Sequence, residues 1–207
     1  MKLRLTKKRL GIYLEYHIIP LILLALLSYG VFYYPLSKIN EFKNYEKLNF
    51  FCEAGVIIDN DLTEDIMEKH SEILEVNYYA YSPNNININS LFEAFGLDSD
   101  ILIMRETNLK DLDYVIDEVF VGFDLNEQSI KFDTYSYNNK VYGFKVYDCS
   151  NQTYNEQFKF DQFISFVPNV DSYYMVLNKK SVNIGQFNSL SKTSYALEVY
   201  KEVLARY

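Results

Sequence analysis

Residues 18–34 read IIPLILLALLSYGVFYY, a run of 17 residues without a charged side chain. As a helix this run is about 26 Å long at 1.5 Å per residue, close to the roughly 30 Å hydrocarbon core of a bilayer. Five Lys or Arg residues precede it within MKLRLTKKRL, the first ten positions. Because cytoplasmic flanks of membrane helices are enriched in basic residues, the sequence predicts a membrane anchor with a cytoplasmic N-terminus.

The anchor divides the chain into four predicted segments: a basic cytoplasmic tail (1–11), a transmembrane anchor (12–34), a polar tether (35–46) and an extracytoplasmic domain (47–207). A cleaved signal peptide is the alternative, because Ser28-Tyr-Gly30 is an acceptable cleavage site. The aromatic continuation of the run to Tyr34 favours the uncleaved anchor. Both interpretations place the domain outside the cytoplasm, and the uncleaved anchor would hold it at the cell membrane. The composition, with 20 Tyr, 15 Phe, no Trp and many Asn, Ile and Lys residues, suggests a bacterial cell envelope.

The predicted domain is acidic. The whole chain has 20 basic and 28 acidic residues, and residues 1–34 hold 5 basic and 1 acidic, so the remainder has 15 and 27, a net charge of −12. Such a surface repels the phosphates of nucleic acid and of anionic lipid. We therefore expect no nucleic-acid partner, and contact with the membrane through the anchor.

Two cysteines, Cys52 and Cys149, follow the anchor. In an oxidising compartment they could form a disulfide, which is worth about 4–5 kcal/mol in the chain-entropy model. Two buried free thiols are the equal alternative, and the sequence does not choose between them.

The remainder of the chain alternates between strand and helix patterns. Strands are predicted over residues 47–55, 74–81, 101–104, 131–137, 140–147 and 172–178. The run Ile101–Met104 is apolar throughout, as in strands covered on both faces. The alternation predicts an α/β fold, a three-layer domain with a mostly parallel sheet. The Asn138-Asn139 turn predicts a hairpin, which makes the sheet mixed.

Capping residues and apolar periodicity predict four helices. The residues expected at their starts are Asp61, Ser90, Asn108 and Ser191. Met67 is expected on the apolar face of the first of these helices. The helix after Asn108 has the clearest apolar face, formed by Leu109, Leu112, Val115, Ile116 and Val119.

The sequence carries no motif that compels a reaction. It has no phosphate-binding glycine loop, no H-E-x-x-H, no G-x-S-x-G and no C-x-x-C. Its two histidines, His17 and His70, are too few for a zinc site built from several histidines. We expect no metal site, no cofactor and no enzymatic activity.

One enzyme class matches the gross layout. Sortases have an N-terminal membrane helix and use Cys, His and Arg outside the membrane, and His70 and Cys149 occur here in the right order. However, Cys149 does not follow a Thr-Leu-x-Thr stretch, and a sortase is a β-barrel. A Cys-dependent, sortase-like transpeptidase is therefore the weaker alternative.

Four stretches carry a family resemblance by their order. They are LFEAFG at 91–96 with DSDILIM at 98–104, YNNKVYGFKVY at 137–147, YYMVLNK at 173–179, and ALEVYKEVL at 196–204. Together they resemble extracellular solute-binding proteins of the type II periplasmic-binding fold, the class of the maltose-type binding proteins. Members of that family usually have two lobes, whereas this chain has room for little more than one. Lys145 also stands where the family's hairpin commonly has Pro, and an anchor helix replaces the usual lipidated Cys.

The resemblance implies a single lobe with a shallow ligand site at the carboxyl ends of its strands, where open α/β sheets generally bind. The candidate ligand contacts are Tyr81, Ser82, Arg105, Glu106, Thr107, Tyr147 and Asp148. Tyr81 and Tyr147 are expected to stack on a sugar or hold a peptide, and Arg105 to bind a carboxylate. Alternatively, the tyrosines are core or rim aromatics, and Arg105 forms a surface ion pair with Glu106.

The expected function is that of a membrane-anchored, extracytoplasmic, solute-binding-like module that binds rather than catalyses. The resemblance implies a small-molecule, sugar or peptide ligand and a membrane-protein partner such as a transporter. The alternative is a structural or accessory subunit of a cell-envelope complex that has lost ligand binding.

Overall fold

The fold is described from a computed structural model. It describes residues 7–33, 42–53, 56–57, 61–81, 90, 92–124, 133–150, 153–154, 164–165 and 171–205. The chain forms two compact units, Met1–Phe42 and Lys43–Tyr207.

The first unit contains one long helix. α1 spans Lys7–Ser28 and continues as a π-helical segment, η1, over Tyr29–Tyr33. The stretch Tyr16–Tyr33 is long and apolar enough to cross a membrane, and its side chains are exposed rather than packed in a core. A signal sequence near an N-terminus has the same properties. The helix is thus compatible with both the anchor and the signal-peptide interpretation.

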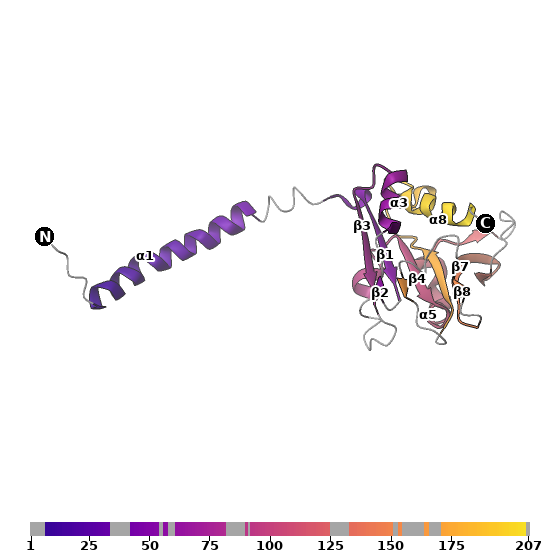
Figure 1. The fold of residues 1–207 in the computed structure, drawn as a ribbon, viewed down its shortest axis with the longest axis horizontal. Coiled ribbons are helices and arrows are strands. Elements are labelled where there is room, and N and C mark those ends of the chain that lie inside the picture. Colours follow the sequence, from indigo (N-terminus) through magenta and orange to yellow (C-terminus); the bar gives the residue numbers. More distant parts are fainter. Residues whose placement is uncertain are drawn as a thin grey trace. The chain divides into compact units, whose positions relative to one another are not determined.

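The second unit is a mixed α/β domain (Figure 1). Its strands are β1 (Lys47–Cys52), β2 (Val56–Ile57), β3 (Glu75–Ala80), β4 (Ile101–Arg105), β5 (Phe123–Asp124), β6 (Thr134–Tyr137), β7 (Lys140–Asp148), β8 (Thr153–Tyr154), β9 (Ile164–Ser165) and β10 (Tyr173–Leu177). Its helical segments are η2 (Asn44–Glu46), α3 (Asp61–Lys69), η3 (Phe92–Gly96), α5 (Glu106–Asp111), η4 (Asp113–Val115), α6 (Ile116–Val119), η7 (Gly185–Phe187) and α8 (Tyr195–Ala205).

The main sheet has the strand order β3-β1-β4-β10-β7-β5, with β6 and β8 also paired to β7. β1 runs parallel to both β3 and β4, and the remaining described pairs of this sheet are antiparallel. The mixed α/β fold is therefore confirmed, with its parallel part confined to β3, β1 and β4. The predicted hairpin is also confirmed, because Asn138 and Asn139 have φ of 47° and 62° and join β6 to β7. Asn tolerates this left-handed conformation better than most residues.

Helical segments cover both faces of the sheet. On one face, Ile66 of α3 and Leu197 and Tyr200 of α8 join the core cluster that contains Phe50 and Ile103. Figure 1 shows α3 beside α8. On the other face, α5 and α6 contribute Leu109 and Ile116 to a second cluster. Ile101–Met104 of β4 is at most 2% exposed because it lies between the two clusters, as its apolar run predicted.

The helix predicted after Asn108 is wrong as one element. The structure has three short pieces there, α5, η4 and α6, and Arg105 is the residue that precedes the first turn. Asp111 and Asp113 flank the break and are weak helix formers. Asn108 lies inside α5, where its amide contacts a neighbouring strand end instead of capping the helix.

Two further predictions of helix detail are wrong. α8 begins at Tyr195, and the Ser191 hydroxyl accepts a hydrogen bond from the Ile184 N–H at 3.0 Å instead of capping that helix. Met67 is 37% exposed, whereas Ile66 is buried, because α3 turns Ile66 toward the sheet.

Candidate functional site

The six predicted ligand contacts that the structure describes lie at one end of the main sheet. The parallel strands β3, β1 and β4 end there, at Ala80, Cys52 and Arg105. Tyr173, the first residue of β10, is paired with both Arg105 and Tyr147. β7 therefore also finishes at this end, which we call the carboxyl end of the sheet. The opposite end, where β1, β3 and β4 begin, is the amino end.

Tyr81 and Tyr147 lie on opposite faces of the sheet. Tyr81 packs against Phe51, with ring centroids 5.8 Å apart, on the α5 side. Tyr147 is 2% exposed on the α8 side, where its ring meets Tyr173 edge to face. The structure therefore does not bring the two tyrosines together around one ligand. Their packing agrees with the alternative that they are core aromatics.

A buried carboxylate follows β1 at the carboxyl end. Glu53 is 1% exposed. Its Oε2 accepts a hydrogen bond from the backbone N–H of Arg105 at 2.8 Å, and its Oε1 accepts one from the side-chain amide of Asn108 at 2.8 Å. Burial raises the pKa of Glu53, while these two donors and the Arg105 charge act in the opposite direction. The Glu53 carboxylate thus links the end of β1 to Arg105 at the end of β4 and to Asn108 in α5.

The Arg105 guanidinium is less well satisfied than the carboxylate beside it. Its Nε lies 3.8 Å from the Glu53 Oε2, is buried and has no hydrogen bond. Within the described part of the chain, no other residue forms a hydrogen bond or ion pair with this guanidinium, and the side chain is 17% exposed. A planar guanidinium with uncommitted N–H groups is suited to bidentate binding of a carboxylate.

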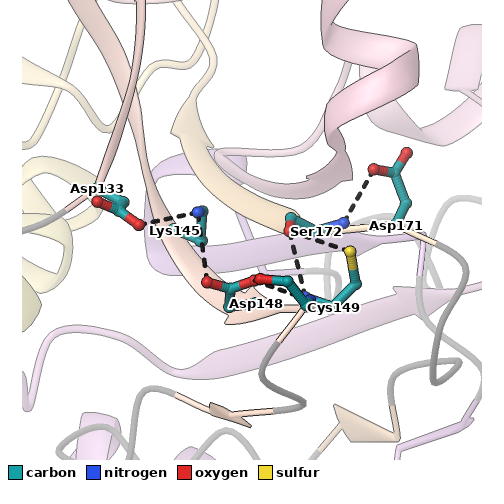
Figure 2. A network of polar contacts seen from close by, with 7 residues as sticks. Asp133, Lys145, Asp148, Cys149, Asp171 and Ser172 are labelled. Carbon is teal, nitrogen blue, oxygen red and sulfur yellow. Dashed lines mark hydrogen bonds and ion pairs between the residues drawn. The ribbon is translucent and has the colours of Figure 1, made fainter.

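Two other acidic side chains are engaged by their neighbours (Figure 2). The Lys145 ammonium lies 2.9 Å from Asp133 and 3.6 Å from Asp148. The hydroxyl of Ser150 and its backbone N–H both donate to Asp148, which lowers the pKa of that carboxyl group. Asp148 is therefore occupied by protein contacts, unlike the Arg105 guanidinium.

Asp171 organises the start of β10. It accepts hydrogen bonds from the backbone N–H groups of Ser172 and Thr107, each at 2.9 Å. The Ser172 hydroxyl in turn accepts the Cys149 N–H at 3.2 Å and donates toward the Cys149 sulfur at 3.5 Å (Figure 2). Thr107 thus belongs to a local network that joins the first turn of α5 to the start of β10 and the end of β7.

The other two predicted contacts have different positions. Glu106 pairs with Lys110 at 2.6 Å, one turn further along α5, and not with Arg105. Its side chain therefore lies in a surface ion pair, which is of small energetic weight. Ser82 lies outside the described residues.

The cysteines are free thiols in this structure. Cys52 ends β1 and Cys149 follows β7, and the two intervening strands place them about 14 Å apart at the usual strand spacing. A disulfide requires Cα atoms within about 7 Å, so this fold does not allow the pairing. Burial raises the pKa of the Cys52 thiol.

The sortase-like arrangement is not formed. His70 precedes β3 at the amino end of the sheet, where its ring contacts Glu202 of α8 at 3.0 Å. Cys149 lies at the carboxyl end, so the two residues are separated by the length of the sheet. Among the described residues, no group of three or more His, Cys, Asp or Glu side chains could hold a metal ion.

Sequence reasoning missed Glu53, Asn108 and Asp171 at this site. The predicted strand over residues 47–55 contains Glu53, whereas β1 ends at Cys52. A carboxylate directly after the buried stretch Phe50-Phe51-Cys52 was the signal that could have located it. Comparison of the chain with protein-family models, with curated proteins and with solved structures gives no match.

Proposed function

We propose that this chain is a membrane-anchored binding module whose domain lies outside the cytoplasm and binds a carboxylate-bearing ligand at the carboxyl end of its sheet. The observation that carries the proposal is the Arg105 guanidinium, which lies at that end with a buried Nε that has no hydrogen bond. The side chain is 17% exposed, so a ligand carboxylate would reach the terminal nitrogens of the guanidinium, which have no hydrogen bond to the described residues. The module is proposed to bind and not to catalyse.

The membrane part of the proposal rests on α1 and on the five basic residues within the first ten. An uncleaved anchor leaves the full mass of the chain in the membrane fraction. Cleavage near Ser28 would shorten the protein by roughly the length of the helix. Intact mass spectrometry of the membrane fraction distinguishes these outcomes, and protease treatment of cells with intact inner membranes tests whether the domain is outside.

The solute-binding part rests on the resemblance and on where its motifs lie. The stretch over 137–147 forms the turn and β7, and the stretch over 173–179 contains β10, the strand beside β7. Both strands reach the carboxyl end, where β10 lies beside Arg105 and β7 lies on the far side of β10. On this basis we propose a single solute-binding-like lobe that docks on a membrane protein such as a transporter.

A thermal-shift experiment tests ligand binding. The full-length protein in detergent is heated with succinate, glucuronate or trialanine, three soluble probes that carry carboxylates. We expect a saturable rise in melting temperature with at least one probe, and loss of that rise in Arg105→Lys, which keeps the charge but not the planar fork. Lys110→Gln, a nearby control in the surface pair with Glu106, should respond like the wild type. No rise with any probe contradicts the proposal.

A second candidate is a structural subunit of a cell-envelope complex that has lost its ligand. Two observations favour this candidate: Lys145 forms ion pairs with Asp133 and Asp148, and Tyr147 is buried, so these side chains are occupied by the protein itself. Detergent extraction with affinity capture distinguishes this candidate. It predicts a stoichiometric protein partner and no response of the melting temperature to the carboxylate probes.

A further inference from the structure

A second polar site lies at the amino end of the main sheet, away from Arg105. It is a pocket of about 550 Å³, within the usual size range of small-molecule sites. Its floor comes from β1 and β3, and its walls come from the segment before β4 and the turn after β10. No residue of this pocket was predicted as a site from the sequence.

The floor is a ladder of cross-strand pairs on one face of the parallel strands. Lys47 is paired with Glu75 through an ion pair of 3.0 Å. Asn49 is next in the ladder and receives a hydrogen bond of 3.0 Å from the Asn77 amide. Whichever way the two amides are oriented, the single hydrogen bond between them leaves one whole NH2 group and one carbonyl oxygen without a partner among the described residues.

Asp100 lines the pocket but is committed to the protein. Its carboxylate accepts the Asn49 N–H at 2.7 Å, the Ser181 hydroxyl at 2.5 Å and the Asn183 amide at 3.0 Å. These bonds fix β1 against the turn after β10. The floor of the pocket is thereby held in place before any ligand arrives, which lowers the entropic cost of binding.

The walls carry two uncommitted charges of opposite sign. Asp98 and Lys180 both line the pocket and are exposed. Neither charged group has a hydrogen bond or an ion pair with the part of the chain that the structure describes. A ligand that carries one positive and one negative group complements both walls, while the Asn49–Asn77 pair supplies polar contacts between them.

We propose that this pocket binds a small zwitterion of the amino-acid type, a free amino acid or a short peptide with both termini unblocked. Its carboxylate faces Lys180 and its ammonium faces Asp98. The site is separate from the one at Arg105 and does not rest on the function proposed above.

Isothermal titration of the full-length protein in detergent tests the proposal. The probes are the free L-amino acids, dialanine, and N-acetyl-alanine amide, which has no charged terminus. We expect saturable binding of a free amino acid or of dialanine and none of the blocked analogue. Binding of amino acids but not dialanine identifies the free molecule, and the reverse result identifies the peptide.

Two charge-removing variants assign the binding to the pocket. Lys180→Met and Asp98→Asn should each weaken binding about tenfold, as expected for loss of one charged contact. Both side chains are exposed, so the variants should fold normally. The matched controls Lys201→Met and Asp124→Asn, exposed residues outside the pocket, should bind like the wild type. All of these variants are compared in the Arg105→Lys background, so that a carboxylate bound at the other end of the sheet does not contribute to the measured heat. No saturable heat with any charged probe, equal binding of the blocked analogue, or equal loss in the controls would overturn the proposal.

Discussion

The two ends of the main sheet are both rich in polar groups, but they use them differently. At the carboxyl end, Glu53 and Asp148 are engaged by protein donors, and Arg105 retains uncommitted N–H groups. At the amino end, Asp100 is fully engaged, while Asp98 and Lys180 face a pocket. Buried groups that are engaged by protein donors should therefore govern stability, and uncommitted groups should govern binding. Substitutions can separate the two roles.

The largest effect is expected at Asp100, which is 3% exposed. Asp100→Ala leaves the buried Asn49 N–H and the donors of Ser181 and Asn183 without their acceptor. We expect it to lower the free energy of unfolding by about 3–5 kcal/mol, measured by urea denaturation. Asp98→Ala, two residues away and exposed, is the control and should unfold like the wild type. Equal destabilisation by both variants would contradict the division of roles.

The same carboxylate should make stability depend on pH. Burial raises the pKa of Asp100 to about 6, against the opposing effect of its hydrogen-bond donors, and the unfolded value is about 3.9. The folded state therefore binds the proton more tightly than the unfolded state. Protonation of Asp100 therefore adds about 3 kcal/mol to the free energy of unfolding. This stabilisation is fully present below about pH 4 and is lost as the pH rises through about 6.

The wild type should accordingly lose more stability between pH 4 and pH 7 than Asp100→Ala does. Urea denaturation of both proteins at the two pH values measures the difference. A parallel pH dependence of the two proteins would show that Asp100 does not titrate in this range.

A somewhat smaller loss is expected at the carboxyl end. Glu53→Ala removes the acceptor of two hydrogen bonds, from the backbone N–H of Arg105 and from the Asn108 side-chain amide. It also removes the negative charge nearest to the Arg105 guanidinium. We expect a loss of about 2–4 kcal/mol, because the carboxylate is buried and doubly bonded. Glu106→Ala removes only the surface pair with Lys110 and should leave the unfolding curve unchanged. If Glu53→Ala unfolds like the wild type, the contacts of Glu53 with Arg105 and Asn108 do not stabilise the fold.

Sequence reasoning located the fold better than the site. The apolar run Ile101–Met104 and the Asn138-Asn139 turn are local signals, and both have the predicted structure. The predicted tyrosine pair failed because the face on which Tyr147 lies depends on a register shift between Tyr173 and Tyr174 of the neighbouring strand. Register irregularities of this kind depend on the pairing of strands that are distant in sequence.

The amino-end pocket was missed for a related reason. Lys47 and Asn49 alternate along β1, and Glu75 and Asn77 alternate along β3, a pattern visible in the sequence. Only the parallel register, with Asn49 opposite Asn77, turns these two patterns into one polar floor. The contributions of Asp98 and Lys180 require the turn after β10 to lie beside the segment before β4, which no local pattern predicts.

Carboxylate binding at Arg105 is tested by observing the Arg105 Nε–H by nuclear magnetic resonance during a succinate titration of the full-length protein in detergent micelles. Arg105→Lys identifies the resonance by its disappearance. If Arg105 binds a carboxylate, this resonance should move saturably with succinate and remain unmoved by equal concentrations of chloride. A resonance that stays in place throughout the titration, or that moves equally with chloride, would contradict a carboxylate site at the carboxyl end of the sheet.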